Sequence, residues 1–127
     1  MNFPAGLKYS DHDEWFRIEG DLVTIGITAY AQDALGELVH VELPEVGDTI
    51  AAGDAVCEVE SVKAVAEVYC PADAEVVEIN EELDGAEETV NSDPYGGGWM
   101  VRVRLAEAGS LDGLLDAAAY QAKIEAG

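Results

Sequence analysis

Residues 56–70 read VCEVESVKAVAEVYC, and this stretch decides the fold. Strand-forming residues lead up to its centre and away from it, a composition typical of two paired strands. We predict a β-hairpin there, with Val62 and Lys63 as the two central residues of its turn. The turn lacks Gly, Pro, Asn and Asp, which usually make a tight turn favourable. Such a hairpin holds Lys63 on its tip, away from the body of the protein.

A solvated charge is the ordinary role of a lysine on a turn, and Lys63 differs from that pattern in two ways. Its neighbours Val62 and Ala64 are apolar, and they suit a neutral acyl-lysine better than a solvated ammonium. The chain contains only two other lysines, Lys8 and Lys123. We therefore treat Lys63 as a candidate for acylation.

The length of 127 residues fits a single domain, and we expect residues 1–127 to form one. An apolar fraction of 49% is enough for a hydrophobic core. No apolar run approaches the roughly 20 residues that span a bilayer. The N-terminal residues carry neither the basic flank nor the apolar core of a secretory signal. These features predict a soluble, cytoplasmic protein.

The chain is strongly acidic, with 27 acidic and 6 basic residues and a net charge of −21. Repulsion from phosphates argues against nucleic acid and against anionic membrane surfaces as partners. Two interpretations of the charge stay open: steering onto basic partner proteins, and solubility in a salty cytoplasm. We expect a monomer.

The two cysteines, Cys57 and Cys70, are predicted to be free thiols. In the predicted hairpin register Cys57 faces Val68, and Cys70 lies two residues further along the partner strand. Such diagonal positions are roughly 7–8 Å apart, outside comfortable disulfide geometry. The chain has no CxxC and no His/Cys cluster with metal-ligand spacing, so we expect no metal site.

The rest of the chain predicts a mainly β protein. Besides the hairpin, we expect strands near residues 15–18, 22–27, 38–43, 75–79 and 99–105. Many short strands separated by turns suit a small sandwich or barrel. Residues 80–90 are expected to form a loop or short helix, and residues 91–98 a loop.

Two helices are predicted. Thr28 is a good N-cap for a short helix at residues 29–35, which Gly36 ends. Ser110 is expected to cap a closing helix with one apolar face. That face consists of Leu111, Leu114, Leu115, Ala118, Ala119 and Ala122.

Several blocks of sequence closely resemble the glycine cleavage system H-protein family. These blocks are ESVKA (60–64), GITAYAQDALG (26–36), VELPEVG (41–47) and VNSDPYGGGW (90–99). They occur in the family's order, and the resemblance extends from about residue 7 to 124. It implies a barrel-sandwich hybrid fold, like that of lipoyl and biotinyl carriers, with a short internal helix and a C-terminal helix.

The resemblance also implies a covalent cofactor. Lys63 matches the lysine that carries lipoic acid in amide linkage. Its neighbours Glu60, Ser61, Val62 and Ala64 match the residues recognised when the lipoyl group is attached.

The implied role is that of a non-catalytic carrier. Its swinging arm shuttles the aminomethyl group of glycine between glycine decarboxylase (P protein), aminomethyltransferase (T protein) and dihydrolipoamide dehydrogenase (L protein). A lipoate-attaching enzyme is a further implied partner. Tethering raises the effective concentration of the intermediate at each partner.

Family members are thought to fold the loaded arm back into a surface cleft. Glu14 matches the acidic residue before the family's tryptophan, and Glu67 lies where an acidic residue often follows the lysine. The family's His-Glu-Trp is changed here, because Asp13 separates His12 from Glu14. We take Glu14, Glu67 and His12 as candidate cleft residues, with solvated acidic surface as the alternative for the two glutamates.

Other functions that an exposed lysine or serine suggests fit the sequence less well, with one exception. Biotinyl carriers usually flank their lysine with methionines, and lipoyl domains of 2-oxo-acid dehydrogenases place an acid before it, where Val62 stands here. A Schiff-base enzyme needs a desolvated lysine, which an exposed tip does not provide. No histidine lies near Ser61 in sequence to activate it as a nucleophile. A paralogue that relays lipoyl groups to other complexes stays open.

Overall fold

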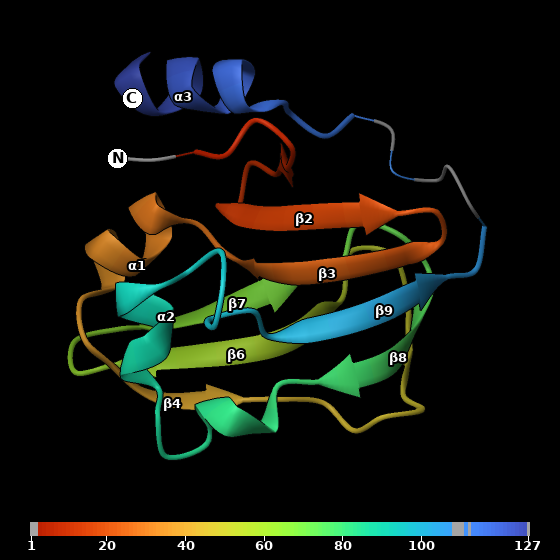
Figure 1. Ribbon diagram of the computed structural model, residues 1–127, viewed down its shortest axis with the longest axis horizontal. Coiled ribbons are helices and arrows are strands. Elements are labelled where there is room, and N and C mark those ends of the chain that lie inside the picture. Colours follow the sequence, from red (N-terminus) through yellow and green to blue (C-terminus); the bar gives the residue numbers. More distant parts are fainter. Residues whose placement is uncertain (1–2, 108–110, 112, 127) are drawn as a thin grey trace.

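The structure, a computed structural model, describes residues 3–107, 111 and 113–126. Its strands form two sheets that pack against each other, with α1 and α2 at one end and α3 along one side (Figure 1). The larger sheet has the order β1-β2-β3-β9-β8-β5 and the smaller has the order β4-β6-β7. The predicted mainly β class, with a short internal helix and a C-terminal helix, is confirmed.

The strands have the following bounds. They are β1 (Lys8–Tyr9), β2 (Glu14–Glu19), β3 (Leu22–Ile27), β4 (Leu38–Glu42), β5 (Thr49–Ile50), β6 (Ala55–Ser61), β7 (Val65–Tyr69), β8 (Ala74–Ile79) and β9 (Val101–Leu105).

The predicted hairpin is formed by β6 and β7. Cys57 faces Val68 across the two strands, as expected. The Ser61 N–H donates to the Ala64 carbonyl at 2.8 Å, which closes a turn whose central residues are Val62 and Lys63. Cys57 and Cys70 are both free and buried, in agreement with the prediction.

Helix α1 (Ala29–Leu35) begins and ends where the sequence predicts. The Thr28 hydroxyl accepts the Ala31 N–H at 3.2 Å and so caps the first turn. Gly36 ends the helix with φ +83°, a conformation that other residues rarely adopt.

The segment between β8 and β9 is more helical than predicted. A 3₁₀ turn (η1, Glu81–Leu83) is followed by α2 (Glu88–Ser92), so Asn91 and Ser92 are helical rather than part of a loop. The Asn91 side chain explains the difference. Its amide donates to the Gly36 carbonyl at 2.8 Å and accepts the Leu38 N–H at 3.0 Å. This long-range bonding fixes α2 against the α1–β4 connection.

The prediction for the closing helix is wrong at its start. Helix α3 spans Ala117–Ala126, and residues 111–116 precede it. Gly113 has φ +88°, which is incompatible with a helix, and Leu115 pairs with Tyr9 through two backbone hydrogen bonds of 2.7 and 2.8 Å. The Asp116 carboxylate accepts the Ala119 N–H at 2.8 Å at the start of α3. The predicted cap, Ser110, lies outside the described residues.

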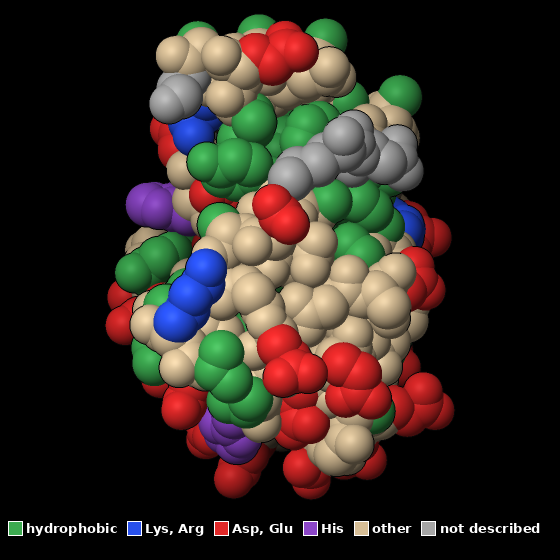
Figure 2. All heavy atoms as spheres, turned by 90° about the vertical axis from the view of Figure 1, so that its left-hand side faces the viewer, with side chains coloured by type: hydrophobic (Ala, Val, Ile, Leu, Met, Phe, Trp, Pro, Cys, Tyr) green, Lys and Arg blue, Asp and Glu red, His purple; other side chains and the backbone are tan. Residues whose placement is uncertain are grey.

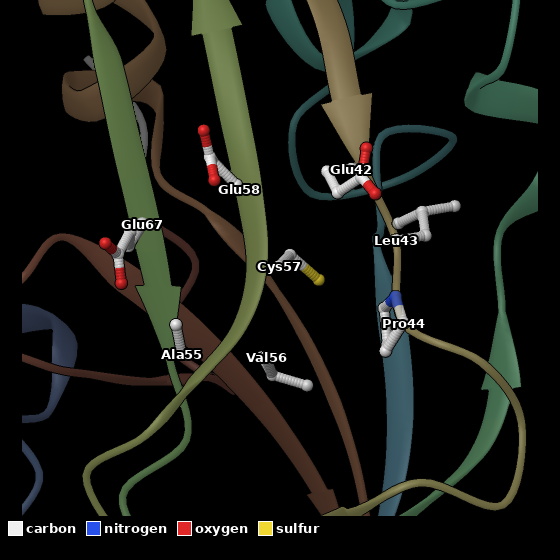
Figure 3. Close-up of a pocket in the computed structure, with 8 residues that line it drawn as sticks. All are labelled: Glu42, Leu43, Pro44, Ala55, Val56, Cys57, Glu58 and Glu67. Carbon is white, nitrogen blue, oxygen red and sulfur yellow. The ribbon is translucent and has the colours of Figure 1, made fainter.

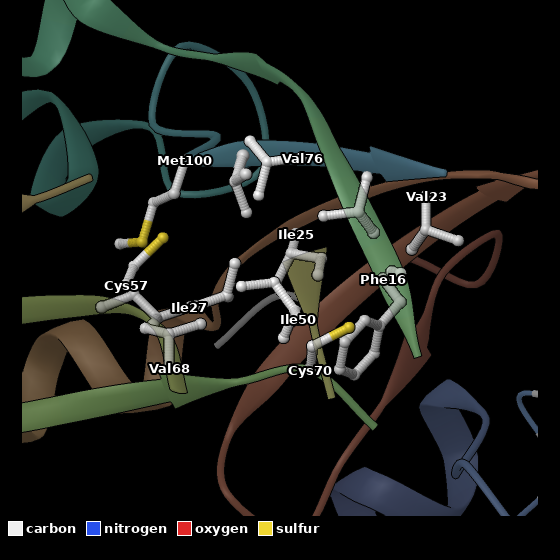
Figure 4. Packing of buried hydrophobic residues seen from close by; sticks show 14 of the residues in the cluster. Phe16, Val23, Ile25, Ile27, Ile50, Cys57, Val68, Cys70, Val76 and Met100 are labelled. Carbon is white, nitrogen blue, oxygen red and sulfur yellow. The ribbon is translucent and has the colours of Figure 1, made fainter. Parts of the chain in front are cut away.

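Most buried apolar side chains lie between the two sheets. Figure 4 shows Ile25 and Ile27 of β3 close to Cys57 and Val68 of the hairpin, so β6 and β7 are anchored by their inward faces. A second cluster joins α3 to the N-terminal segment, where the Tyr9 and Tyr120 rings stack at 4.8 Å. No helix in the described part of the chain combines the length and apolar character needed to cross a membrane.

Candidate functional site at the hairpin tip

The hairpin turn is stabilised by the Ser61 hydroxyl. This oxygen accepts the backbone N–H of Lys63 at 3.3 Å and that of Ala64 at 3.0 Å. It also lies 3.3 Å from the Ala64 carbonyl, to which it donates. Ser61 therefore replaces the Gly or Asn that a tight turn usually needs, because its side chain satisfies backbone groups of the turn.

Lys63 is exposed on this turn, beside the C-terminal end of α1. A methyl group placed on Gly36 would lie 3.5 Å from Cε of Lys63, so the lysine stem passes over this glycine. Among the described residues Lys63 takes part in no ion pair. Figure 2 views the end of the molecule where α1, α2 and the hairpin turn lie, and an extended basic side chain is visible in the left half of that face.

The residues that flank Lys63 divide between the surface and the interior. Glu60, Val62 and Ala64 are exposed, whereas Ser61 is buried beneath the turn. A partner that approaches Lys63 therefore meets Glu60, Val62 and Ala64 directly, and Ser61 acts through the conformation of the turn.

Glu14 is buried, so the interpretation as solvated surface is wrong for this residue. Its side chain is 2% exposed at the start of β2. One carboxylate oxygen accepts the Ser10 hydroxyl at 2.7 Å, and the other accepts the Tyr69 N–H. Burial raises the pKa of the Glu14 carboxyl above its ordinary value, although both hydrogen bonds oppose that rise.

The hydrogen bond to Tyr69 ties the two sheets together. Tyr69 ends β7, an edge strand of the smaller sheet, whereas Glu14 begins β2 of the larger sheet. An edge strand has backbone groups without a strand partner. Glu14 supplies an acceptor for one of them, so its side chain is part of the fold as well as of the pocket beside it.

Glu14 and His12 lie together in one pocket of about 420 Å³. The His12 ring is 5.0 Å from the Tyr69 ring, and His12 itself is exposed. The pocket is lined by Ser10, His12, Glu14, Gly53, Tyr69, Cys70 and Pro71. Of these, Ser10 and Tyr69 were not anticipated, because only the folded chain brings them to Glu14.

Glu67 does not join this pocket. It is exposed on β7 directly opposite Glu58 of β6, as Figure 3 shows. Both glutamates border a different, shallow pocket of about 270 Å³, together with Glu42 of β4. The three predicted cleft residues are therefore divided between two pockets. Within the described ranges, no group of His, Cys, Asp and Glu is arranged to hold a metal ion.

Comparison with known proteins places this architecture in a family. The family model described as "Glycine cleavage H-protein" matches residues 7–127. The H protein of the glycine cleavage system of Chromobacterium violaceum is 54% identical over 126 residues, covering 98% of each chain. That of Idiomarina loihiensis is 52% identical over 125 residues, covering 98% of this chain and 97% of its own.

A solved structure agrees with the sequence comparisons. The crystal structure of a glycine cleavage system H protein from Mycobacterium marinum superposes with a TM-score of 0.88 at 37% identity. The match covers 97% of this chain and 99% of the other. The name shared by these proteins is that of a carrier subunit rather than of a catalyst, which agrees with the expectation that the chain is not itself an enzyme. On these grounds, the chain belongs to the glycine cleavage H-protein family.

Proposed function

We propose that the chain carries lipoic acid in amide linkage to Lys63. It presents this arm in turn to glycine decarboxylase, aminomethyltransferase and dihydrolipoamide dehydrogenase. The observation that supports this most directly is the exposed Lys63 amine on a turn that the Ser61 hydroxyl holds in shape. When attached, lipoic acid supplies a redox-active dithiol, and the protein supplies position and recognition.

The chain's own residues orient the arm and leave its tip free. The anchored inward face of the hairpin supports the Lys63 backbone, while the lysine side chain is exposed and passes over Gly36. We propose that the carrier works as a monomer in the cytoplasm.

The pocket around Glu14 is our candidate for the resting place of the loaded end of the arm. Its carboxylate is the buried acidic group of the pocket, and an ammonium ion brought to it would favour the ionised form. A charge-assisted hydrogen bond of this kind is worth about 1.5–3 kcal/mol when shielded from water. His12 and Tyr69 border the pocket beside this carboxylate. Glu67, which lies apart, contributes charge at a distance.

Intact-mass measurement with peptide mapping tests the attachment site. Treatment with a lipoate ligase, ATP and lipoate should add one lipoyl group to the wild type and none to Lys63→Arg. The variants Lys8→Arg and Lys123→Arg should be modified like the wild type. A lipoyl group found on Lys8 or Lys123 would overturn the assignment.

A second assay tests the role in glycine cleavage. Glycine-dependent bicarbonate exchange should appear only when glycine decarboxylase is added to the lipoylated chain. Exchange by the lipoylated chain alone would contradict a carrier role. Lipoylation without any exchange in the presence of the decarboxylase would favour a relay of lipoyl groups to other complexes.

A further inference from the structure

Three exposed valines gather around the hairpin tip, although they are far apart in sequence. Val62 lies in the turn, and Val65 on β7 faces Glu60 of β6. Val39 lies on β4 at an irregularity in register, between Leu38, which faces Ser61, and His40, which faces Glu60. We call Val39, Val62 and Val65 the valine collar.

The collar is unusually exposed for side chains of this type. The exposed fractions are 46% for Val39, 72% for Val62 and 57% for Val65. In the described chain the other exposed large apolar side chains are Ile18 at 40%, Tyr30 at 36% and Val46 at 60%. Grouped exposed apolar side chains mark contact surfaces more often than single ones do.

Acidic side chains border the collar on the outer face of the smaller sheet. Glu42, Glu58 and Glu67 form one row across β4, β6 and β7, each directly opposite the next. Like charges in such positions destabilise a sheet. His40 Nε2 lies 2.9 Å from a Glu42 carboxylate oxygen, and this hydrogen bond raises the pKa of His40. In the part of the chain that the structure describes, Glu58, Glu60 and Glu67 take part in no ion pair. The row therefore complements a basic surface.

Resting on the proposed function, we propose that the valine collar and its acidic border form the docking surface for the lipoate-attaching enzyme. Before modification the arm is absent, so the enzyme must recognise the protein surface around Lys63. An enzyme that delivers an eight-carbon acyl chain holds that chain in an apolar channel. At the moment of transfer the mouth of this channel lies over Lys63 and covers the valine collar. Basic residues of the enzyme around the mouth then face the acidic border.

The transfer itself follows from the amine on the tip. The Lys63 ammonium loses a proton to a base of the enzyme, and the neutral Nζ attacks the carboxyl carbon of a lipoyl adenylate. A C–N bond forms, the C–O bond to phosphate breaks, and AMP leaves. Recognition by the collar brings the amine to this position and contributes no group to the reaction.

Steady-state lipoylation of the unmodified full-length chain tests the docking surface. A lipoate ligase with ATP and lipoate is the probe. The double variant V39S/V65S should raise the KM for the carrier at least tenfold with little change in kcat, because two apolar contacts are lost on binding. Val39 is 24 positions from Lys63 in sequence, so its effect separates a folded surface from a linear motif.

Val46→Ser is the matched control, because Val46 is 60% exposed and lies between β4 and β5, beyond the end of β4 that is remote from the hairpin turn. It should leave KM unchanged. Thermal unfolding must show that all variants fold, and V39T/V65T, which keeps the β-branched shape, provides a second pair. The docking surface is contradicted if V39S/V65S and V39T/V65T both have the wild-type KM. It is also contradicted if Val46→Ser raises the KM as much as V39S/V65S does. Failure of the ligase to modify wild-type Lys63 would instead overturn the proposed function.

Discussion

At the scale of single residues, Ser61 determines the shape of the tip. Its hydroxyl accepts two backbone N–H groups, of Lys63 and Ala64, in a turn that contains no glycine. Among the described residues, the one non-glycine with positive φ is Asp13, so the turn is formed without left-handed backbone. The Ser61 side chain therefore adds to the backbone hydrogen bond between Ser61 and Ala64 in holding the conformation of Lys63.

We predict that Ser61→Ala loosens the turn without unfolding the protein. The free energy of unfolding should fall by about 1 kcal/mol, because one hydroxyl and its hydrogen bonds to the turn are removed. Amide hydrogen exchange at residues 63 and 64 should quicken, and the rate of lipoylation should fall. Ser92→Ala is the control, since Ser92 is exposed at the end of α2 and its hydroxyl donates to the Thr89 carbonyl. Equal exchange rates at the tip in both variants would contradict this role of Ser61.

At the scale of elements, α3 is held to the sheets by the Tyr120 side chain. Tyr120 is fully buried, and its hydroxyl donates to the Asp13 carboxylate at 2.8 Å. Since that hydrogen is used, the Thr28 hydroxyl donates to the Tyr120 oxygen, also at 2.8 Å. One phenol thus joins α3, the cap of α1 and the residue that precedes Glu14.

We predict that Tyr120→Phe lowers the free energy of unfolding by about 1–3 kcal/mol. The ring can still stack on Tyr9, but Thr28 and Asp13 lose a buried partner. Urea denaturation followed by tryptophan fluorescence measures the change. Tyr30→Phe, at an exposed tyrosine of α1, should change the stability little. A Tyr120→Phe protein as stable as the Tyr30→Phe protein would show that packing alone holds α3.

At the scale of the whole molecule, the two sheets meet at a buried acid. Glu14 links β2 to the end of β7, and burial raises its pKa above the ordinary value of 4.5. For an acid, a raised pKa in the folded state means that the folded protein binds the proton more tightly than the unfolded chain does. The protonated form of Glu14 therefore contributes to the free energy of unfolding at low pH, and this stabilisation is lost as pH rises through the raised pKa.

We therefore predict a pH-dependent difference in stability between the wild type and Glu14→Gln. As pH rises above about 4.5, the wild type should lose stability relative to the variant, by at most about 1.4 kcal/mol per pH unit. The amide of the variant also alters the hydrogen bonds from Ser10 and Tyr69, but that effect is the same at every pH. The other acidic residues are common to both proteins, so their titration cancels in the difference. Urea denaturation from pH 4 to 8 measures the difference. A difference that stays constant over this range would contradict the raised pKa.

The local elements could be predicted from the sequence because short patterns specify them. Thr28 and Gly36 bound α1 by capping rules that involve only neighbouring residues. The alternation around residues 56–70 sets the hairpin register, since a shift of one residue would turn Val59 and Val68 out of the core. The lysine on the tip follows from that register alone.

Other features were decided only by the tertiary structure, because they depend on residues far apart in the chain. The burial of Glu14 requires Tyr69, 55 residues away, as a hydrogen-bond donor. Glu67 is separated from Glu14 because Glu67 lies in one row with Glu58 and Glu42 on the smaller sheet, whereas Glu14 accepts the Tyr69 N–H at the end of β7. The start of α3 depends on the pairing of Leu115 with Tyr9, which competes with a helix that the apolar spacing alone favours. Sequence patterns describe what each segment prefers, whereas these contacts depend on which segments the fold brings together.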